Sequence, residues 1–149
     1  MQTVDLNKYS EFVEKVTSKD SNSLTDFMNR LNRLDANYEA FGPNGEMQHG
    51  PDINVPLLIT AGIGLSSESG EFSEIVKKLL FHGKPLNKEN YDHMVSELGD
   101  VIWYWTNACR ALGVNPNDVV AQNVAKLEAR YPGGKFNTFN AEIRAATDK

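Results

Sequence analysis

The chain of 149 residues is long enough for one domain with a substantial core, and its 40% apolar and 23% charged content is ordinary for a soluble protein. A net charge of −5 argues against nucleic acid or an anionic membrane as the main partner, and a single cysteine excludes an internal disulfide. The N-terminus lacks signal-peptide order, and no apolar run approaches ~18 residues. We therefore expect one cytoplasmic domain over 1–149.

The first half of the chain shows helical periodicity and weak strand signals. A first helix is predicted over about 5–17, and its inward face carries apolar residues: Leu6, Tyr9, Phe12, Val13 and Val16. A second helix is predicted over about 24–40, after a break at Ser21 to Ser23 that offers cap residues. Residues 41–52 hold three glycines and two prolines, which predicts a loop long enough for a lid or binding role.

The third predicted helix, over about 55–81, contains an anomaly. Its apolar seam follows a strict spacing of three and four residues: Leu58, Ala61, Leu65, Glu68, Phe72, Ile75 and Leu79. Only Glu68 in this series is charged, and a charge in a core seam is costly without a partner. Gly62, Gly64 and Gly70 weaken the helix by roughly 1 kcal/mol each relative to Ala, or allow a neighbour to approach closely.

The fourth and fifth helices complete an all-α bundle of about five helices. The fourth is predicted over about 88–112, with an apolar seam of Met94, Leu98, Val101, Trp105, Ala108 and Leu112. Beside this seam runs a polar line of His93, Glu97, Asp100, Tyr104 and Asn107. Asn115 and Pro116 form the start of a fifth helix, which Pro132 and two glycines end.

Two acidic pairs, Glu68 with Glu71 and Glu97 with Asp100, have the spacing of residues that share a helix face. Two antiparallel helices joined by a short loop would set these pairs opposite each other. A cluster of four carboxylates needs a partner, and Mg²⁺ and Mn²⁺ prefer carboxylate oxygens. Two solvated helix faces are the alternative, which fits poorly with Glu68 in an apolar seam.

The motifs at these positions resemble a known family. Residues 65–71 (LSSESGE) and 97–104 (ELGDVIWY) are similar to the signature of MazG-type all-α nucleoside triphosphate pyrophosphohydrolases, namely Glu-x-x-Glu, a gap of one to two dozen residues, then Glu-x-x-Asp. Residues 123–134 (NVAKLEARYPGG) resemble the family's segment after the metal helices. The likeness covers about residues 57–136.

The resemblance implies Mg²⁺-dependent cleavage of a (d)NTP to the (d)NMP and pyrophosphate, with Mn²⁺ as the alternative ion. Glu68, Glu71, Glu97 and Asp100 would be the metal ligands, and a metal-bound water would attack the α-phosphorus. One of these four acids, with Glu71 as the candidate, would instead orient the water as general base, and the sequence does not separate the two roles. MazG-like chains assemble, and the apolar seams agree, so we expect a homodimer or homotetramer.

Further residues are candidates for the substrate. Lys126 and Arg130, one turn apart, suit phosphate oxygens, although surface cations near a helix C-terminus are also common. Asn123 on the same stripe suits phosphate or sugar. Tyr104 and Asn107 continue the line from Asp100 towards substrate, or support the ligands.

Three other functions were weighed. One is a hydrolase of another pyrophosphate-linked nucleotide, such as a nucleotide sugar or a guanosine alarmone, and another is a non-catalytic helical interaction module. Glu46 and His49 form a single Glu-x-x-His in a loop, whereas di-iron bundles use two such pairs on helices, so a di-iron oxidase is set aside.

Overall fold

The computed structural model describes residues 5–36, 38–41, 47–49 and 51–142, of which 38–41 and 47–49 are described by their backbone alone. The chain divides into two compact units, Met1–Val55 and Pro56–Lys149. The described residues form seven helices and one pair of strands, so the helical fold class is confirmed. The prediction of a single domain over 1–149 stays a prediction, and each unit is described by itself.

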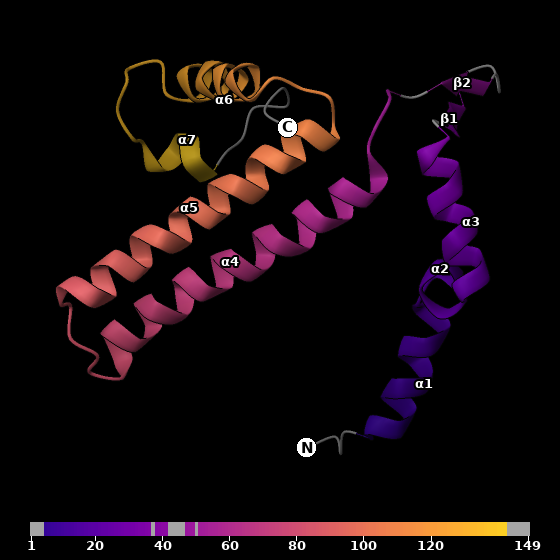
Figure 1. Cartoon of the computed structure of the whole chain (residues 1–149), viewed down its shortest axis with the longest axis horizontal. Helices are drawn as coiled ribbons and strands as arrows, with labels where there is room; N and C mark the ends of the chain where they lie inside the picture. The colour runs from indigo at the N-terminus through magenta and orange to yellow at the C-terminus, as the bar shows by residue number, and fades with distance from the viewer. Residues whose placement is uncertain (1–4, 37, 42–46, 50, 143–149) are drawn as a thin grey trace. The chain divides into compact units, whose positions relative to one another are not determined.

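Unit 1 begins with three helices, α1 (Leu6–Val16), α2 (Lys19–Asn22) and α3 (Leu24–Asp35), drawn in indigo and purple in Figure 1. Side-chain caps fix where the longer two begin. The Asp5 carboxylate accepts a hydrogen bond from the backbone N–H of Asn7 at 3.1 Å, and the Ser23 hydroxyl accepts one from the N–H of Asp26 at 3.2 Å. The first two predicted helices are therefore present, and the short α2 was not predicted.

A two-stranded hairpin follows α3, where a helix reaching residue 40 and then a loop had been predicted. Strand β1 (Tyr38–Phe41) pairs antiparallel with β2 (Met47–His49), and Phe41 lies opposite Met47. Aromatic residues favour strands, and the intervening sequence contains Asn-Gly, a common hairpin turn pair. The predicted end of the second helix is wrong for this reason. Residues 42–46 and 50 of the predicted loop lie outside the described residues.

The apolar stripe of α1 lies on the surface of unit 1. All five residues predicted to face inward are exposed: Leu6, Tyr9, Phe12, Val13 and Val16. The inward prediction is therefore wrong within unit 1, because α2 and α3 pack on each other and leave this stripe uncovered. An uncovered apolar stripe is a feature of surfaces that bind a partner.

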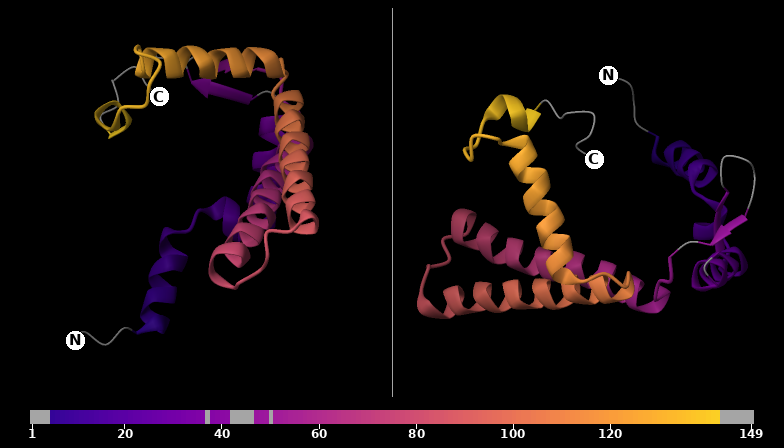
Figure 2. Two further views of the ribbon diagram at one scale, coloured as in Figure 1. Left: turned by 90° about the vertical axis from the view of Figure 1, so that its left-hand side faces the viewer. Right: turned by 90° about the horizontal axis from the view of Figure 1, so that it is seen from above.

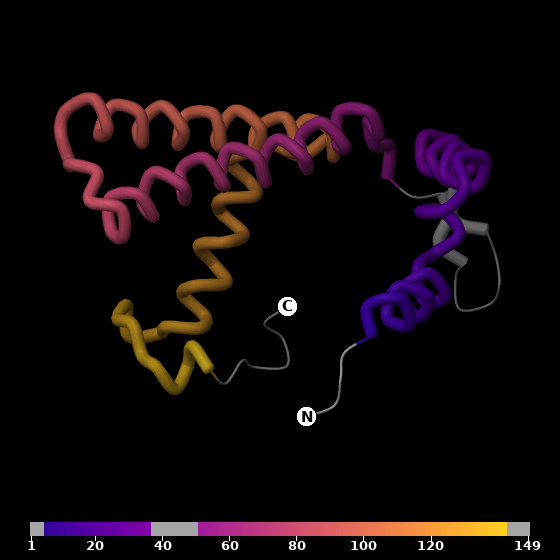
Figure 3. Tube along the Cα trace, turned by 90° about the horizontal axis from the view of Figure 1, so that it is seen from below, coloured from indigo at the N-terminus to yellow at the C-terminus, as the bar shows by residue number. Residues whose placement is uncertain are grey.

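Unit 2 is built on a pair of long antiparallel helices, α4 (Val55–Phe81) and α5 (Lys88–Ala111), which lie side by side in Figures 1, 2 and 3. Gly83, with a φ of 67°, lies in the connection, where the N–H of Lys84 donates to the carbonyl of Lys78 at 3.1 Å. The Asn87 side chain then caps α5 by accepting from the N–H of Asn90 at 3.0 Å. Both helices agree with their predicted bounds.

The two helices bury different kinds of face. On α4 the predicted seam is inward, with Ala61 and Ile75 buried and the other members half-buried: Leu58, Leu65, Glu68, Phe72 and Leu79. On α5 both lines have inward positions: Glu97 is 6% exposed and Asn107 is 4% exposed, while four members of the predicted apolar seam are half-buried, namely Met94, Val101, Trp105 and Ala108. Leu98 and Leu112 of the predicted apolar seam are exposed instead. The predicted seam of α5 is therefore inward only in part, and the polar line shares the inward positions because Glu97 meets Glu68 of α4.

The chain ends with α6 (Pro116–Arg130) and α7 (Thr138–Glu142). The Asn115 side chain accepts from the N–H of Asn117 at 2.9 Å and Pro116 is the first helical residue, which confirms the predicted start. Helix α6 leaves the C-terminal end of α5 and runs away from the α4–α5 pair (Figures 2 and 3). The Asn140 amide donates to the carbonyl of Arg130 at 2.9 Å and so ties α7 to the end of α6.

Two further expectations concern single residues and the membrane. Cys109 is buried and unpaired, as expected for a small apolar residue in the core. Among the helices that the structure describes, none combines the length and the apolar character required to cross a bilayer.

Candidate metal centre

Three carboxylates converge where α4 and α5 lie side by side. Glu68 comes from α4, and Glu97 and Asp100 come from α5. One carboxylate oxygen from each residue lies within 4.8 Å of the others. Glu97 is buried, Glu68 is half-buried and Asp100 is exposed, so the cluster lies at the edge of the helix pair with one side open to solvent. Oxygen donors at this spacing suit a hard divalent cation.

Glu71, the fourth predicted ligand, is not a member of this close group. It lies on α4 one turn beyond Glu68, and its side chain is exposed. Its negative charge still acts on Glu68, because it is the largest electrostatic cause of the change in the pKa of that residue. The structure thus brings three of the four acids together and leaves Glu71 beside them.

The crowding of negative charge is visible in the ionisation of Glu68. Partial burial is the main cause that raises its pKa above the ordinary value. The charges of Glu71, Asp100 and Glu97 raise the pKa further, and a hydrogen bond between the Glu68 and Glu97 side chains adds to the effect. Each of these causes favours a proton on Glu68, and each would be relieved by a cation among the carboxylates.

Glu74 provides a contrast on the same helix. Its carboxylate forms ion pairs with Lys77 and, at 3.4 Å, with Lys78. The hydrogen bond from Lys77 is the main cause that lowers the pKa of Glu74. Two lysines already balance the charge of the Glu74 carboxylate, and Glu74 is not a member of the close group of three carboxylates.

His93 contacts the cluster, although the sequence analysis did not include it in the site. Its Nε2 atom lies 2.9 Å from Oε1 of Glu97, one turn further along α5. The side chain of His93 is 52% exposed, whereas that of Glu97 is only 7% exposed. The spacing of four residues between His93 and Glu97 on a predicted helix was the signal that could have revealed this contact.

Tyr104 lies against α4 at a glycine. A Cβ atom built on Gly64 would overlap the Tyr104 ring, so the absence of a side chain at residue 64 is what lets this ring pack so close to α4. The Trp103 and Tyr104 rings are nearly perpendicular, with centroids 4.7 Å apart. Tyr104 is one turn from Asp100, and its packing therefore holds the two helices together beside the cluster.

Asn107 is buried and uses its amide within α5. Its Nδ2 donates to the carbonyl of Trp103 at 3.1 Å, and its Oδ1 accepts from Nη1 of Arg110 at 2.9 Å. Both ends of the amide are thus engaged by residues of the same helix. These contacts are those of a residue that supports α5.

The three remaining predicted substrate residues lie on α6. Asn123 and Lys126 are exposed, and Arg130 is half-buried at the last turn. Helix α6, which carries all three residues, runs away from the α4–α5 pair (Figure 3). They form a polar stripe at helical spacing.

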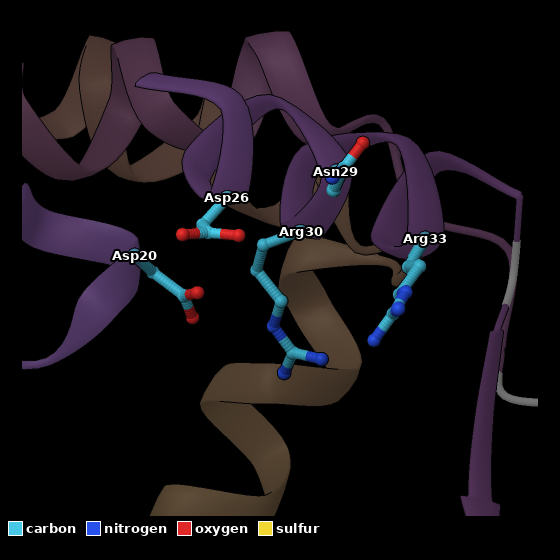
Figure 4. A pocket seen from close by; sticks show the side chains of 5 residues that line it. All are labelled: Asp20, Asp26, Asn29, Arg30 and Arg33. Carbon is cyan, nitrogen blue, oxygen red and sulfur yellow. The ribbon is translucent and has the colours of Figure 1, made fainter. Parts of the chain in front are cut away.

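Unit 1 has a polar hollow of its own, of about 310 Å³. Figure 4 shows its lining, which consists of Asp20 from α2 and Asp26, Asn29, Arg30 and Arg33 from α3. Two aspartates face two arginines, so the formal charges of the lining cancel. The lining therefore favours neither an anionic nor a cationic ligand.

Comparison with known proteins gives the family. Residues 60–134, half of the chain, match the model described as MazG nucleotide pyrophosphohydrolase domain. The chain is 37% identical over 73 residues to the Gene 37 protein of Mycobacterium phage L5. The aligned segment covers 48% of this chain and 64% of that relative, which is less than two thirds of the relative's length. No solved structure matches. The matched segment contains the three converging carboxylates and Glu71, and the chain therefore belongs to the MazG nucleotide pyrophosphohydrolase domain family.

Proposed function

We propose that the protein is a Mg²⁺-dependent nucleoside triphosphate pyrophosphohydrolase that cleaves a (d)NTP to the (d)NMP and pyrophosphate. The observation that carries this proposal is the convergence of Glu68, Glu97 and Asp100 within the segment that matches the MazG family. Family membership supports the reaction class, and the acidic cluster supports the dependence on a metal.

The residues present fit a divalent cation. Glu68, Glu97 and Asp100 would hold it, with Mg²⁺ as the expected ion and Mn²⁺ as its substitute, because their donors are all carboxylate oxygens. The raised pKa of Glu68 supports the fit, since the cluster carries more negative charge than it can balance by itself. When bound, the metal would neutralise charge on the triphosphate and acidify a water molecule.

Glu71 is suited to receive a proton from that water. It lies outside the close group of carboxylates and is exposed, so its oxygens stay available to a water at the edge of the cluster. Two roles are open to Glu71, a fourth ligand or a general base, and its position favours the second.

Substrate contacts are divided between two helices in this proposal. Lys126 and Arg130 would meet phosphate oxygens, and Asn123 on the same stripe would meet phosphate or sugar. The packing of Tyr104 against Gly64 and the engaged amide of Asn107 favour the supporting role for these two residues over direct contact with the nucleotide.

We also propose a homodimer or homotetramer. Large apolar side chains are exposed on both long helices of unit 2: Ile59, Ile63, Leu80, Phe81, Val95, Leu98, Ile102 and Trp103. Exposed apolar side chains in this number on two neighbouring helices support an assembly interface. The uncovered stripe of α1 supports the same conclusion for unit 1.

A panel of nucleotides assayed for pyrophosphate release, with and without Mg²⁺, tests the function. We expect release from triphosphates only when a divalent cation is present. Glu71→Gln and Asp100→Asn should lower turnover by at least about 10²-fold, while circular dichroism shows an unchanged fold. Glu74→Gln is the matched control and should keep activity, because Glu74 is paired with lysines.

Other outcomes point to the other functions. Full activity in Asp100→Asn would contradict the proposed site. Cleavage of a nucleotide sugar or an alarmone without triphosphate turnover would reassign the substrate. Binding of neither Mg²⁺ nor a non-hydrolysable triphosphate in a calorimetric titration would indicate a helical interaction module.

A further inference from the structure

Glu97 is the most buried member of the acidic cluster, and its carboxylate has neighbours on two sides. On one side it shares a hydrogen bond with Glu68, and Asp100 lies within the same group. On the other side Nε2 of His93 lies 2.9 Å from its Oε1 atom. Glu68 and Asp100 are acids, whereas His93 is a neighbour that never carries negative charge.

The chemistry of the two groups fixes the direction of this bond. An ionised carboxylate only accepts, so the proton lies on Nε2 of His93. A neutral imidazole and a charged one both offer that N–H, and the bond therefore forms in either state of the ring. One lone pair of Oε1 of Glu97 is then engaged by His93, whereas this bond leaves both lone pairs of Oε2 unused.

We propose that His93 is a positioning residue, which holds Glu97 by Oε1 and so presents Oε2 towards the divalent cation of the cluster. Without it, a glutamate beside two other acids would turn away from their charge. Partners of this kind, which bond to a metal ligand and fix its orientation, are a general feature of metal sites. The inference rests on the proposed function, since it concerns the same metal.

The contact geometry leaves one competing role for His93. A nitrogen and an oxygen 2.9 Å apart are also at the spacing of two neighbouring ligands of one ion, so His93 itself would be a ligand in that case. The close group of possible ligand atoms contains the three carboxylates and not His93, which favours the positioning role. The two roles differ in whether nitrogen is bonded to the metal.

Titration of the full-length chain with Mn²⁺, followed by electron paramagnetic resonance of the free ion, measures the effect. We expect His93→Ala to weaken Mn²⁺ binding by about 10-fold, the lower end of the range for such partners, because His93 is half exposed. His93→Gln should restore most of the affinity, since its amide can donate from a similar position. His82→Ala, which changes an exposed histidine at the end of α4, is the matched control and should bind as the original chain does.

Two more readouts separate a positioning role from a general loss of structure. With saturating Mg²⁺ the kcat of His93→Ala should recover, while the Mg²⁺ concentration for half-maximal activity rises about 10-fold. Pulsed resonance of bound Mn²⁺ should show no directly bonded ¹⁴N nucleus. A directly bonded ¹⁴N, or unchanged Mn²⁺ affinity in His93→Ala, would overturn the proposal and leave the proposed function intact. Absence of Mn²⁺ binding in the original chain would instead contradict the proposed function.

Discussion

Glu68 is the one charged residue in the seam of α4, whose other six members are apolar. Its carboxylate meets those of Glu97 and Asp100, and its pKa is raised by partial burial and by the surrounding negative charges. A core made only for stability would place a leucine here. Glu68 therefore destabilises the metal-free chain, and the divalent cation that we propose for this site would remove that cost.

The raised pKa of Glu68 predicts how stability depends on pH. The folded chain holds the Glu68 proton to a higher pH than the unfolded chain, whose pKa is near 4.5. Between these two pKa values the folded state binds more protons, so this contribution to stability falls as pH rises. In thermal melts in EDTA, the original chain should lose stability as the pH rises towards neutral, and the Glu68→Gln variant should lose less.

Glu74 supplies a control of opposite sign. Its pKa is lowered by the hydrogen bond from Lys77, so its contribution is present at neutral pH and is lost as pH falls through the folded pKa. Glu74→Gln should therefore flatten the acid side of the profile. If Glu68→Gln and Glu74→Gln changed the profile in the same direction, the charge crowding inferred at Glu68 would be contradicted. Mg²⁺ should also bind more weakly as the pH falls, because protons then compete with the metal for the Glu68 carboxylate.

The site residues differed in how far sequence could predict them. Glu68 was predictable because a charge in an apolar series is a local signal, and Glu97 with Asp100 followed from spacing and resemblance. His93 was missed, because a single histidine at helical spacing from an acid is common and its meaning depends on Glu97 being buried. The separation of Glu71 from the other three acids depends on how α4 and α5 face each other across the pair, which spacing alone does not specify.

At the scale of elements, the α4–α5 pair shows what local sequence does and does not determine. The ends of both helices follow from local features, such as Gly83 at a positive φ and the Asn87 cap, and these were predicted closely. The buried positions of α5 were predicted only in part, because a burial prediction assumes that only the more apolar line of a helix turns inward. Glu97 and Asn107 of the polar line are buried as well, and Glu97 meets Glu68 on α4.

Gly64 and Gly70 on α4 allow a matched test of the close approach of the helices. A Cβ atom at Gly64 would overlap the Tyr104 ring, whereas one at Gly70 would meet nothing within 4 Å. Gly70→Ala should stabilise the chain by about 1 kcal/mol, the difference in helix propensity. Gly64→Ala should destabilise it by about 1–2 kcal/mol, because overpacking outweighs that gain. Urea unfolding in EDTA measures both.

The Tyr104 ring is the stated cause of this difference and can be removed. In a chain that already carries Tyr104→Ala, the cost of Gly64→Ala should shrink or become a gain, which a double-mutant cycle would report as coupling. Equal stabilisation by Gly64→Ala and Gly70→Ala would show that the two helices are not in close contact at residue 64.

At the scale of the whole molecule, each unit leaves an apolar surface uncovered. The α1 stripe was predicted to face inward, but no helix among the described residues of unit 1 covers it. An apolar stripe in a sequence predicts that a helix face is buried, but it does not predict which element or which chain covers that face. Several apolar residues of α4 and α5 are also exposed, and a homo-oligomer is proposed because it would cover them.

A charge placed in this surface tests the assembly. Ile63 on α4 is 68% exposed in the single chain, so Ile63→Asp costs little within the chain and should act mainly on an interface. We expect the original chain to sediment as a dimer or tetramer, and Ile63→Asp to dissociate towards monomers at low micromolar concentration. Ser73→Asp, on the same helix, adds the same charge at an exposed polar residue and should leave the assembly intact. If the original chain sedimented as a monomer, or if both variants kept its assembly, the exposed apolar face of α4 would have no part in self-association.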